Sequence, residues 1–191
     1  MESLSFDLAR APLREVNRFL HGPAGALEGR QVRIENPDGA HNIAVGLNAA
    51  VKVTIAGHAG YYAGSASTGV AENMMSGRVH VKGFASNAAG ASAHGGLLVV
   101  DGDAGLRCGI SLKGADIVVG GSVGSFSGFM AQAGRIVICG NAGHALGDSL
   151  YEAVIYERRA RLARGGRAPL AAGRRGPARA GPAARRARPP P

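Results

Sequence analysis

The sequence predicts an all-β protein, a single-stranded right-handed parallel β-helix with about six coils of 19 residues each. Two observations support this prediction: glycines recur at a fixed interval, and a short apolar strand precedes each group of glycines. The glycines Gly83, Gly102, Gly121 and Gly140 follow one another at a constant interval of nineteen positions. A fixed period of this length is typical of a solenoid, in which each coil stacks on its neighbours.

Three segments align without gaps and define the repeat. They are LLVVDGDAGLRCG, ending at Gly109, DIVVGGSVGSFSG, ending at Gly128, and RIVICGNAGHALG, ending at Gly147. Each reads as a strand followed by the pattern G-x-x-G-x-x-x-G. The segments RVHVKGFASNAAG and VKVTIAGHAGYYAG extend the pattern upstream, and QVRIE followed by NPDGAHNIAVG gives a weaker sixth coil.

Apolar residues occupy alternate positions of every predicted strand, which is the period of a strand with one buried face. A strand of four residues is not stable alone, but coils stacked about 4.8 Å apart align such residues into continuous aliphatic ladders. We therefore expect these ladders to form the core; the inward residues are Val53, Ile55, Val79, Val81, Leu98, Val100, Ile117, Val119, Ile136 and Ile138.

The recurring glycines need a physical reason, because glycine inside regular structure costs roughly 0.5–1 kcal/mol relative to alanine. A coil this short must turn sharply several times, so some residues take positive φ, and side chains at its corners would collide with the next coil. The pattern lacks the recurring Leu and Asn of leucine-rich repeats and the Asp of calcium-binding repeats. The predicted structural glycines are Gly57, Gly60, Gly64, Gly83, Gly90, Gly102, Gly105, Gly109, Gly121, Gly124, Gly128, Gly140, Gly143 and Gly147.

One interval departs from the period. Gly57 and Gly83 are twenty-six positions apart, whereas two full coils would need thirty-eight. The sequence therefore predicts that about twelve positions of a coil are absent and that Ser65 to Ser76 forms an irregular excursion in place of a strand.

The ends of the chain differ from the repeat and give three parts: an N-terminal cap over 1–29, the β-helix over 30–156 and a tail over 157–191. In the cap, Pro12 precedes a segment that places Leu13, Val16, Phe19 and Leu20 on one helical face, which predicts a short capping helix. The tail consists almost entirely of Arg, Ala, Gly and Pro, a composition that predicts disorder.

The charge is concentrated in this tail. The 191 residues carry 22 Lys and Arg against 13 Asp and Glu, a net charge of +9. Residues 157–191 contain 11 Arg and one Glu, so the preceding 156 residues are almost neutral, with 11 basic and 12 acidic side chains. The chain has no apolar run typical of a secretory signal or a membrane span, and its two cysteines have no metal-ligand spacing. We expect a soluble, cytoplasmic protein.

The sequence nominates no catalytic, cofactor-binding or metal-binding residue. The glycine groups recur in every coil, whereas a dinucleotide-binding glycine motif occurs once, between a strand and a helix. His58 follows a leading glycine, a position held elsewhere by Phe84 and Asp103, which indicates an outward position and not a ligand. Cys108 and Cys139 are expected to be buried thiols.

Two groups of residues interrupt the pattern and are candidates for contacts with a partner. Methionine side chains adapt to irregular surfaces, and charged residues in the segment RCGISLKGAD either face solvent or pair with a partner. Gap filling inside the chain is the alternative for the methionines. The predicted docking residues are Glu72, Asn73, Met74, Met75, Arg107, Lys113 and Asp116.

The repeated pattern resembles the C-terminal GXGXG domain of the glutamate synthase large subunit over roughly residues 30–156. The segments GHAGYYAG, GVAENMMSGRVHVKG, GGLLVVDGDA, RCGISLKGADIVV, FMAQAG and GDSLYEA most resemble the stand-alone β-helical subunit of N-methylglutamate synthase. Members of that family carry a full coil between GYYAG and GVAENMMSG, which this chain lacks. After YEAVIY the family pattern gives way here to the Arg-rich tail.

The resemblance implies a non-catalytic structural subunit that binds no cofactor itself. Its partners would be a glutamine-amidotransferase-like subunit and a glutamate-synthase-like subunit with FMN and an iron–sulfur cluster. Two alternatives remain open: a scaffold subunit of the formylmethanofuran dehydrogenase type, and a binder of nucleic acids or acidic surfaces through the Arg-rich tail. The tail has no aromatic residues for base stacking, which weighs against nucleic acid.

Overall fold

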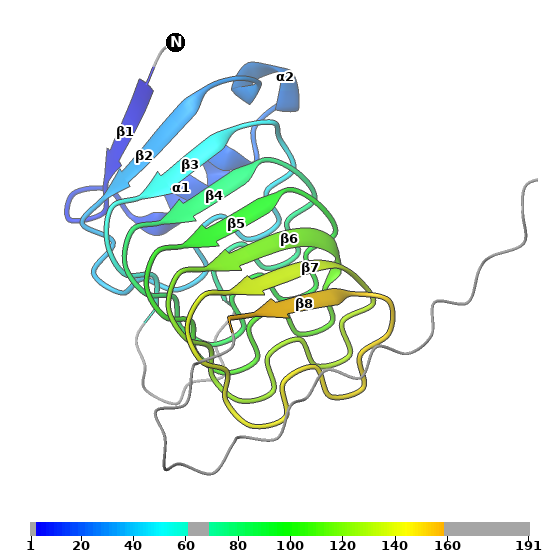
Figure 1. The fold of residues 1–191 in the computed structure, drawn as a ribbon. Helices are drawn as coiled ribbons and strands as arrows, with labels where there is room; N and C mark the ends of the chain where they lie inside the picture. Colours follow the sequence, from blue (N-terminus) through cyan, green and yellow to red (C-terminus); the bar gives the residue numbers. More distant parts are fainter. Residues whose placement is uncertain (1–2, 61–68, 159–191) are drawn as a thin grey trace, which may run out of the picture.

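A computed structural model describes residues 3–60 and 69–158 of the chain. Its strands form one parallel sheet in which each strand lies beside the next in chain order, so one strand belongs to each coil (Figure 1). The prediction of a parallel β-solenoid is confirmed. The strands are β1 (Ser3–Asp7), β2 (Gln31–Glu35), β3 (Lys52–Ile55), β4 (Arg78–Val81), β5 (Leu97–Val100), β6 (Lys113–Val119), β7 (Ala133–Ile138) and β8 (Val154–Glu157).

The two helices, α1 (Leu13–Leu20) and α2 (Ala24–Leu27), lie between β1 and β2. The predicted capping helix is α1: it follows Pro12 directly, and its residues Val16 and Leu20 are buried in the core. Its N-terminal neighbour β1 was not predicted. In this strand Phe6 is opposite Ile34 of β2, so the cap extends the sheet by one strand as well as adding a helix.

The predicted period is exact from β4 onward. Cross-strand neighbours in one column of the sheet follow one another at a separation of 19 residues; they are Arg78, Leu97, Asp116, Arg135 and Val154. The coil from β2 to β3 is two residues longer, because Gln31 is opposite Lys52. Six coils lie between β2 and β8, as the glycine pattern predicts.

In the described part of the chain, the sheet has no additional strand between β3 and β4, as predicted, but the interval is one long coil and not one coil with part of a second. β3 pairs directly with β4, with Lys52 opposite Arg78, so the chain between them forms one coil that is seven residues longer than the period. The described residues 69–76 do not form an irregular excursion. Ala71 (φ 57°) and Asn73 (φ 53°) repeat the backbone of Gly90 (φ 66°) and Ser92 (φ 53°) one coil later. Residues 65–68 of the predicted excursion lie outside the described residues.

The predicted aliphatic ladders are confirmed. Each of the ten inward strand residues is at most 1% exposed. The return leg of each coil adds a second set of inward side chains, so the column is filled from both sides; this set includes Leu47, Met74, Leu112 and Ala131. Stacked aliphatic side chains removed from water supply the main driving force for such a fold.

The recurring glycines have different physical reasons at different positions of the motif. A Cβ on Gly124 would lie 2.7 Å from the carbonyl carbon of Gly105, and one on Gly140 would lie 2.6 Å from that of Gly121. These glycines let successive coils approach closely. In the motifs from β4 onward the last glycine takes positive φ, as Gly109 does at 65°. Gly64, another predicted structural glycine, lies outside the described residues.

Two further predictions concern the C-terminal tail and membrane-spanning helices. Of the tail predicted to be disordered, residues 159–191 lie outside the described residues. Among the residues that are described, the longest helix is α1 with 8 residues, and no helix is long and apolar enough to cross a membrane.

Candidate docking surface on the sheet

The outward face of the sheet changes character along the solenoid. The central outward column carries Arg33, Thr54 and His80 on β2, β3 and β4, and then Val99 on β5. It continues with three apolar side chains, Val118, Val137 and Tyr156. The first half of the face is therefore polar and the second half is apolar. We call the second half, formed by Leu97, Val99, Val118, Val137, Val154 and Tyr156, the apolar outer face.

The sequence explains this change. Strands β2 to β4 alternate between polar and apolar residues, whereas β5 reads LLVV and the last residues of β6 read IVV. Parallel strands that are apolar at successive positions are typical of sheets covered on both faces. Here the inner side is covered by the coil, while Tyr156 is 55% and Val154 is 45% exposed on the outer side. Large exposed apolar patches are found at interaction sites, so this face is a candidate docking surface.

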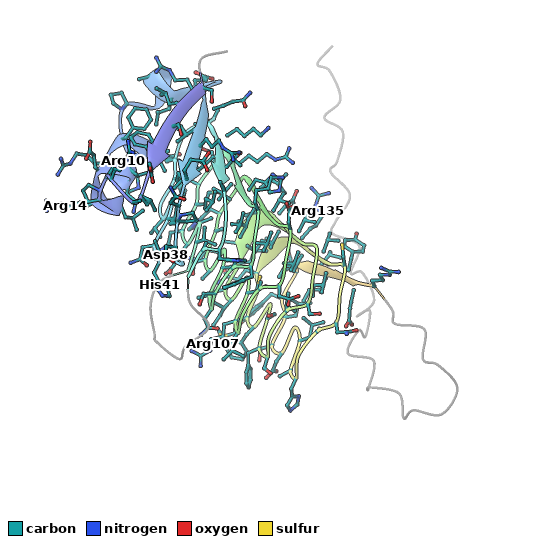
Figure 2. All side chains as sticks on the ribbon, turned by 90° about the vertical axis from the view of Figure 1, so that its left-hand side faces the viewer. Arg10, Arg14, Asp38, His41, Arg107 and Arg135 are labelled. Carbon is teal, nitrogen blue, oxygen red and sulfur yellow. The ribbon has the colours of Figure 1, made fainter. Side chains whose placement is uncertain are left out.

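An ion pair lies in the outer column of the apolar outer face, between Leu97 and Val154. Asp116 on β6 and Arg135 on β7 are direct cross-strand neighbours, and Arg135 donates two hydrogen bonds of 2.8 Å to the carboxylate. Figure 2 shows Arg135 on the sheet side of the molecule, away from Arg107 on the loops. The bidentate pair is satisfied within the chain, so Asp116 needs no partner charge.

The opposite margin carries a second charged cluster, formed by Asp101 with His80 and Lys82. The His80 ring lies 2.7 Å from one carboxylate oxygen of Asp101, and Lys82 Nζ lies 3.3 Å from the other. The hydrogen bond from His80 is the main reason that the pKa of Asp101 lies below its usual value, and Lys82 adds to the effect. The carboxylate is therefore charged at neutral pH, at the border between the polar and apolar halves.

The two cysteines lie in opposite environments. Cys108 is fully buried, as predicted, and burial raises the pKa of its thiol to about 12. The prediction that Cys139 is also buried is wrong, because Cys139 directly follows the inward residue Ile138 and therefore points outward. It is an exposed thiol at the margin of the apolar outer face.

The predicted docking residues of the segment ENMM are divided by the fold. Met74 is fully buried in the same inward position of the coil as Leu112, so it fills the core and is not accessible to a partner. Met75 is 46% exposed and Asn73 is exposed. Glu72 is partly buried, where its carboxylate accepts a hydrogen bond of 3.2 Å from the Gly69 N–H; burial raises its pKa.

The predicted docking residues Arg107, Lys113 and Asp116 do not form one patch. Arg107 lies on the return leg with φ 59°, whereas Lys113 is the exposed first residue of β6 and Asp116 lies further along that strand. Near Arg107 the return legs carry a second set of exposed apolar side chains, Leu106, Phe126 and Met130. The sequence already contains the valines, leucine and phenylalanine that give both faces their apolar character. The predicted docking residues did not include them, because only charged residues and residues that interrupt the repeat were considered.

The described residues contain no group of three or more His, Cys, Asp or Glu side chains placed to hold a metal ion. The outward position of His58 holds a different interaction. Its ring stacks on Phe84 with a centroid separation of 4.0 Å, and its Nδ1 accepts a hydrogen bond of 3.1 Å from the Phe84 N–H. The same position thus links neighbouring coils.

Comparison with known proteins gives one informative similarity. Part of the chain is 50% identical over 85 residues to Protein GlxC from Rhizobium meliloti (strain 1021). The match covers 38% of this chain and 37% of GlxC, so the similarity spans little more than a third of that protein. No protein-family model matches the sequence, and no solved structure matches it. The comparisons support a GlxC-like relationship over the matched part of the chain.

Proposed function

We propose that this chain is a non-catalytic structural subunit of a glutamate-synthase-like enzyme complex, in which the apolar outer face binds a partner polypeptide. The narrower proposal is the β-helical subunit of N-methylglutamate synthase. Its partners would be a glutamine-amidotransferase-like subunit and a subunit that carries FMN and an iron–sulfur cluster. The chemistry would take place in those subunits, while this chain holds them in register.

The observation that carries the proposal is the change from polar to apolar on the outer face. Val99, Val118 and Val137 repeat an outward apolar side chain on three successive strands. Core packing does not require these residues, because the inward ladder already fills the coil. The similarity to GlxC and the resemblance of the glycine motifs to the glutamate synthase domain support the choice of complex.

The outer face also has the anatomy of a protein interface. Its central column is aliphatic and ends with an aromatic residue, Tyr156, on the last strand β8, and both margins carry charged side chains. Interfaces commonly combine an apolar centre with a polar rim, and tyrosine is enriched among residues that dominate binding energy. The Asp116–Arg135 pair at the rim keeps its own charges neutralised whether or not a partner is present.

The proposal is tested by co-expressing the tagged full chain with the polypeptides encoded by neighbouring genes. We expect the purified complex to contain FMN and an amidotransferase-like subunit. We expect the variant Val118→Glu to lose the partners, because an unpaired carboxylate would be buried in the interface. The matched control is Thr54→Glu, which adds the same charge to the same column on the polar half and should retain them.

Circular dichroism must first show that both variants keep the fold of the parent. Equal retention of partners by Val118→Glu and Thr54→Glu would show that the apolar outer face is not the interface. A complex with molybdenum or tungsten in place of FMN would instead assign the chain to the formylmethanofuran dehydrogenase type. A chain that binds none of these polypeptides would contradict the proposal altogether.

A further inference from the structure

A cluster of positive charge lies at the other end of the sheet, where β2, β3 and β4 begin. Arg30, Lys52 and Arg78 line a hollow of about 280 Å³ together with the backbone of Gly29 and Gly77. The three cations come from three successive coils. Since neighbouring strands of a sheet lie about 4.8 Å apart, the fold places the three side chains in one region of the surface.

The register of the sheet makes this cluster unfavourable by itself. Lys52 is directly opposite Arg78 in the parallel pair of β3 and β4. Like charges that face each other across strands are destabilising. The same column further along the solenoid places Asp116 opposite Arg135, and that pair forms a bidentate salt bridge. The same cross-strand geometry therefore places opposite charges together in Asp116 and Arg135 and like charges together in Lys52 and Arg78.

The described residues supply no counter-charge to the cluster. None of the three cations forms an ion pair among residues 3–60 and 69–158. Glu28, the acidic residue nearest to Arg30 in sequence, does not line the hollow. The nearby Arg33 is paired with Glu35 and carries no free charge into the site.

We propose that this hollow is a binding site for a compact polyvalent oxyanion of the phosphate class. The wall of the hollow is mostly carbon, so the two guanidinium groups and one ammonium group of these residues would have to turn toward a bound anion. Arginine is suited to bidentate contacts with phosphate oxygens. The volume is slightly below the 300–1,000 Å³ of typical small-molecule pockets, so it has room for a phosphate group and part of a molecule that carries it. A bound oxyanion would also remove the repulsion between Lys52 and Arg78.

The test uses thermal unfolding of the full chain at constant ionic strength in chloride, phosphate, a phosphomonoester or succinate. We expect a saturable gain with phosphate beyond that with chloride, roughly 4 °C at a concentration ten times the dissociation constant. Glycerol phosphate tests whether the site binds a phosphoryl group on a larger molecule as well as a free phosphate ion. Only a site that is open to solvent on one side binds both. Succinate tests whether a dicarboxylate can replace phosphate.

The double variant Lys52→Gln, Arg78→Gln separates a binding site from a structural role. At low salt without phosphate we expect it to unfold at a higher temperature than the parent, because the repulsion is gone. We also expect its phosphate affinity to fall at least tenfold. The matched control Lys113→Gln removes an exposed lysine that does not line the hollow and should change neither quantity, and the Arg-rich tail is the same in all three proteins.

Two outcomes would overturn the site. Equal effects of chloride, succinate and phosphate at one ionic strength would show that ions only screen the cluster. A phosphate effect that persists unchanged in the double variant would place the binding elsewhere, for example on the tail. Neither outcome bears on the partner-binding experiment, because the apolar outer face lies on β5 to β8 and the hollow lies at β2 to β4.

Discussion

At the scale of single residues, each position of a coil has its own physical requirement. In every coil from β4 onward, three positions of the return leg take positive φ, as Arg107 (59°), Gly109 (65°) and Ser111 (52°) do in one of them. Glycine occupies the middle position because it is also crowded from the core: a Cβ on Gly109 would lie 2.7 Å from Ile136 Cδ1. Where side chains can point outward, the protein uses non-glycine residues despite the strain.

The two cysteines give a prediction at this scale. We expect a thiol reagent such as iodoacetamide to modify Cys139 in the native protein and to leave Cys108 unmodified. The reason is that Cys108 is fully buried with a pKa of about 12, so its thiolate fraction at pH 8 is roughly one in ten thousand. Peptide mass spectrometry before and after denaturation distinguishes the two sites.

The variant Cys139→Ser is the control and should show no fast modification in the native state. Rapid labelling of Cys108 in folded protein would mean that the return leg opens far more readily than its complete burial indicates. Cys139 lies beside the apolar outer face, so its protection in a purified complex would also report on partner binding.

At the scale of elements, the two faces of one strand contribute differently to stability. Ile117 points inward and is fully buried, with its Cδ1 atom close to the Gly90 and Gly109 positions of the return legs. Its neighbour Val118 points outward and is only partly buried. The inward residue holds the two sides of the coil together, whereas the outward residue is available to a partner.

We expect Ile117→Ala to lower the free energy of unfolding by about 2–5 kcal/mol, because it removes buried carbon atoms and leaves a cavity over the glycine column. Val118→Ala should cost less, below about 2 kcal/mol in the isolated chain, because it removes fewer carbon atoms and part of this side chain already faces solvent. Urea denaturation of the two variants measures the difference. Similar losses for both would show that the outward valine is covered in the free protein.

At the scale of the whole molecule, stability is a sum over coils and the contacts between neighbours. Each strand pairs only with the strand before and after it, from β1 to β8. The constant coil length in the second half makes these coils interchangeable in register. Proteins with this architecture tolerate loss of a complete repeat better than loss of a fraction of one.

We therefore expect a variant that lacks residues 97–115 to fold with one coil fewer. The deletion joins Gly96 to Asp116 and brings Asp116 opposite Arg78, so the inward ladder continues with Ile117 beside Val79. The loss in stability should be about 1–3 kcal/mol, in proportion to the length of the single coil removed. Circular dichroism and cooperative thermal unfolding measure the outcome.

The control deletes residues 97–106, about half a coil, and places return-leg residues where strand residues belong. This variant should lose cooperative unfolding, because the inward and outward positions no longer align. If the two deletion variants unfold with equal cooperativity, the coils are not in the register that the sheet shows.

Much of this fold could be predicted from the sequence because its information is local and periodic. The spacing of the glycines set the coil length, and the alternation within strands identified the inward residues, from Val53 to Ile138. The capping helix was predicted because its apolar residues lie on one helical face. Cys139 was mispredicted although the alternation that makes Ile138 inward makes its neighbour outward.

Only the tertiary structure decided which strands are neighbours. The long interval between Gly57 and Gly83 is compatible with one extended coil or with two shortened ones, and pairing of β3 with β4 selects the first. The same pairing brings Lys52 opposite Arg78, and the pairing of β5 to β7 lines up the valines of the apolar outer face. Period and alternation are properties of the chain, whereas a charge cluster or a docking face arises between coils, where residues distant in sequence are brought together by hydrogen bonding of whole strands.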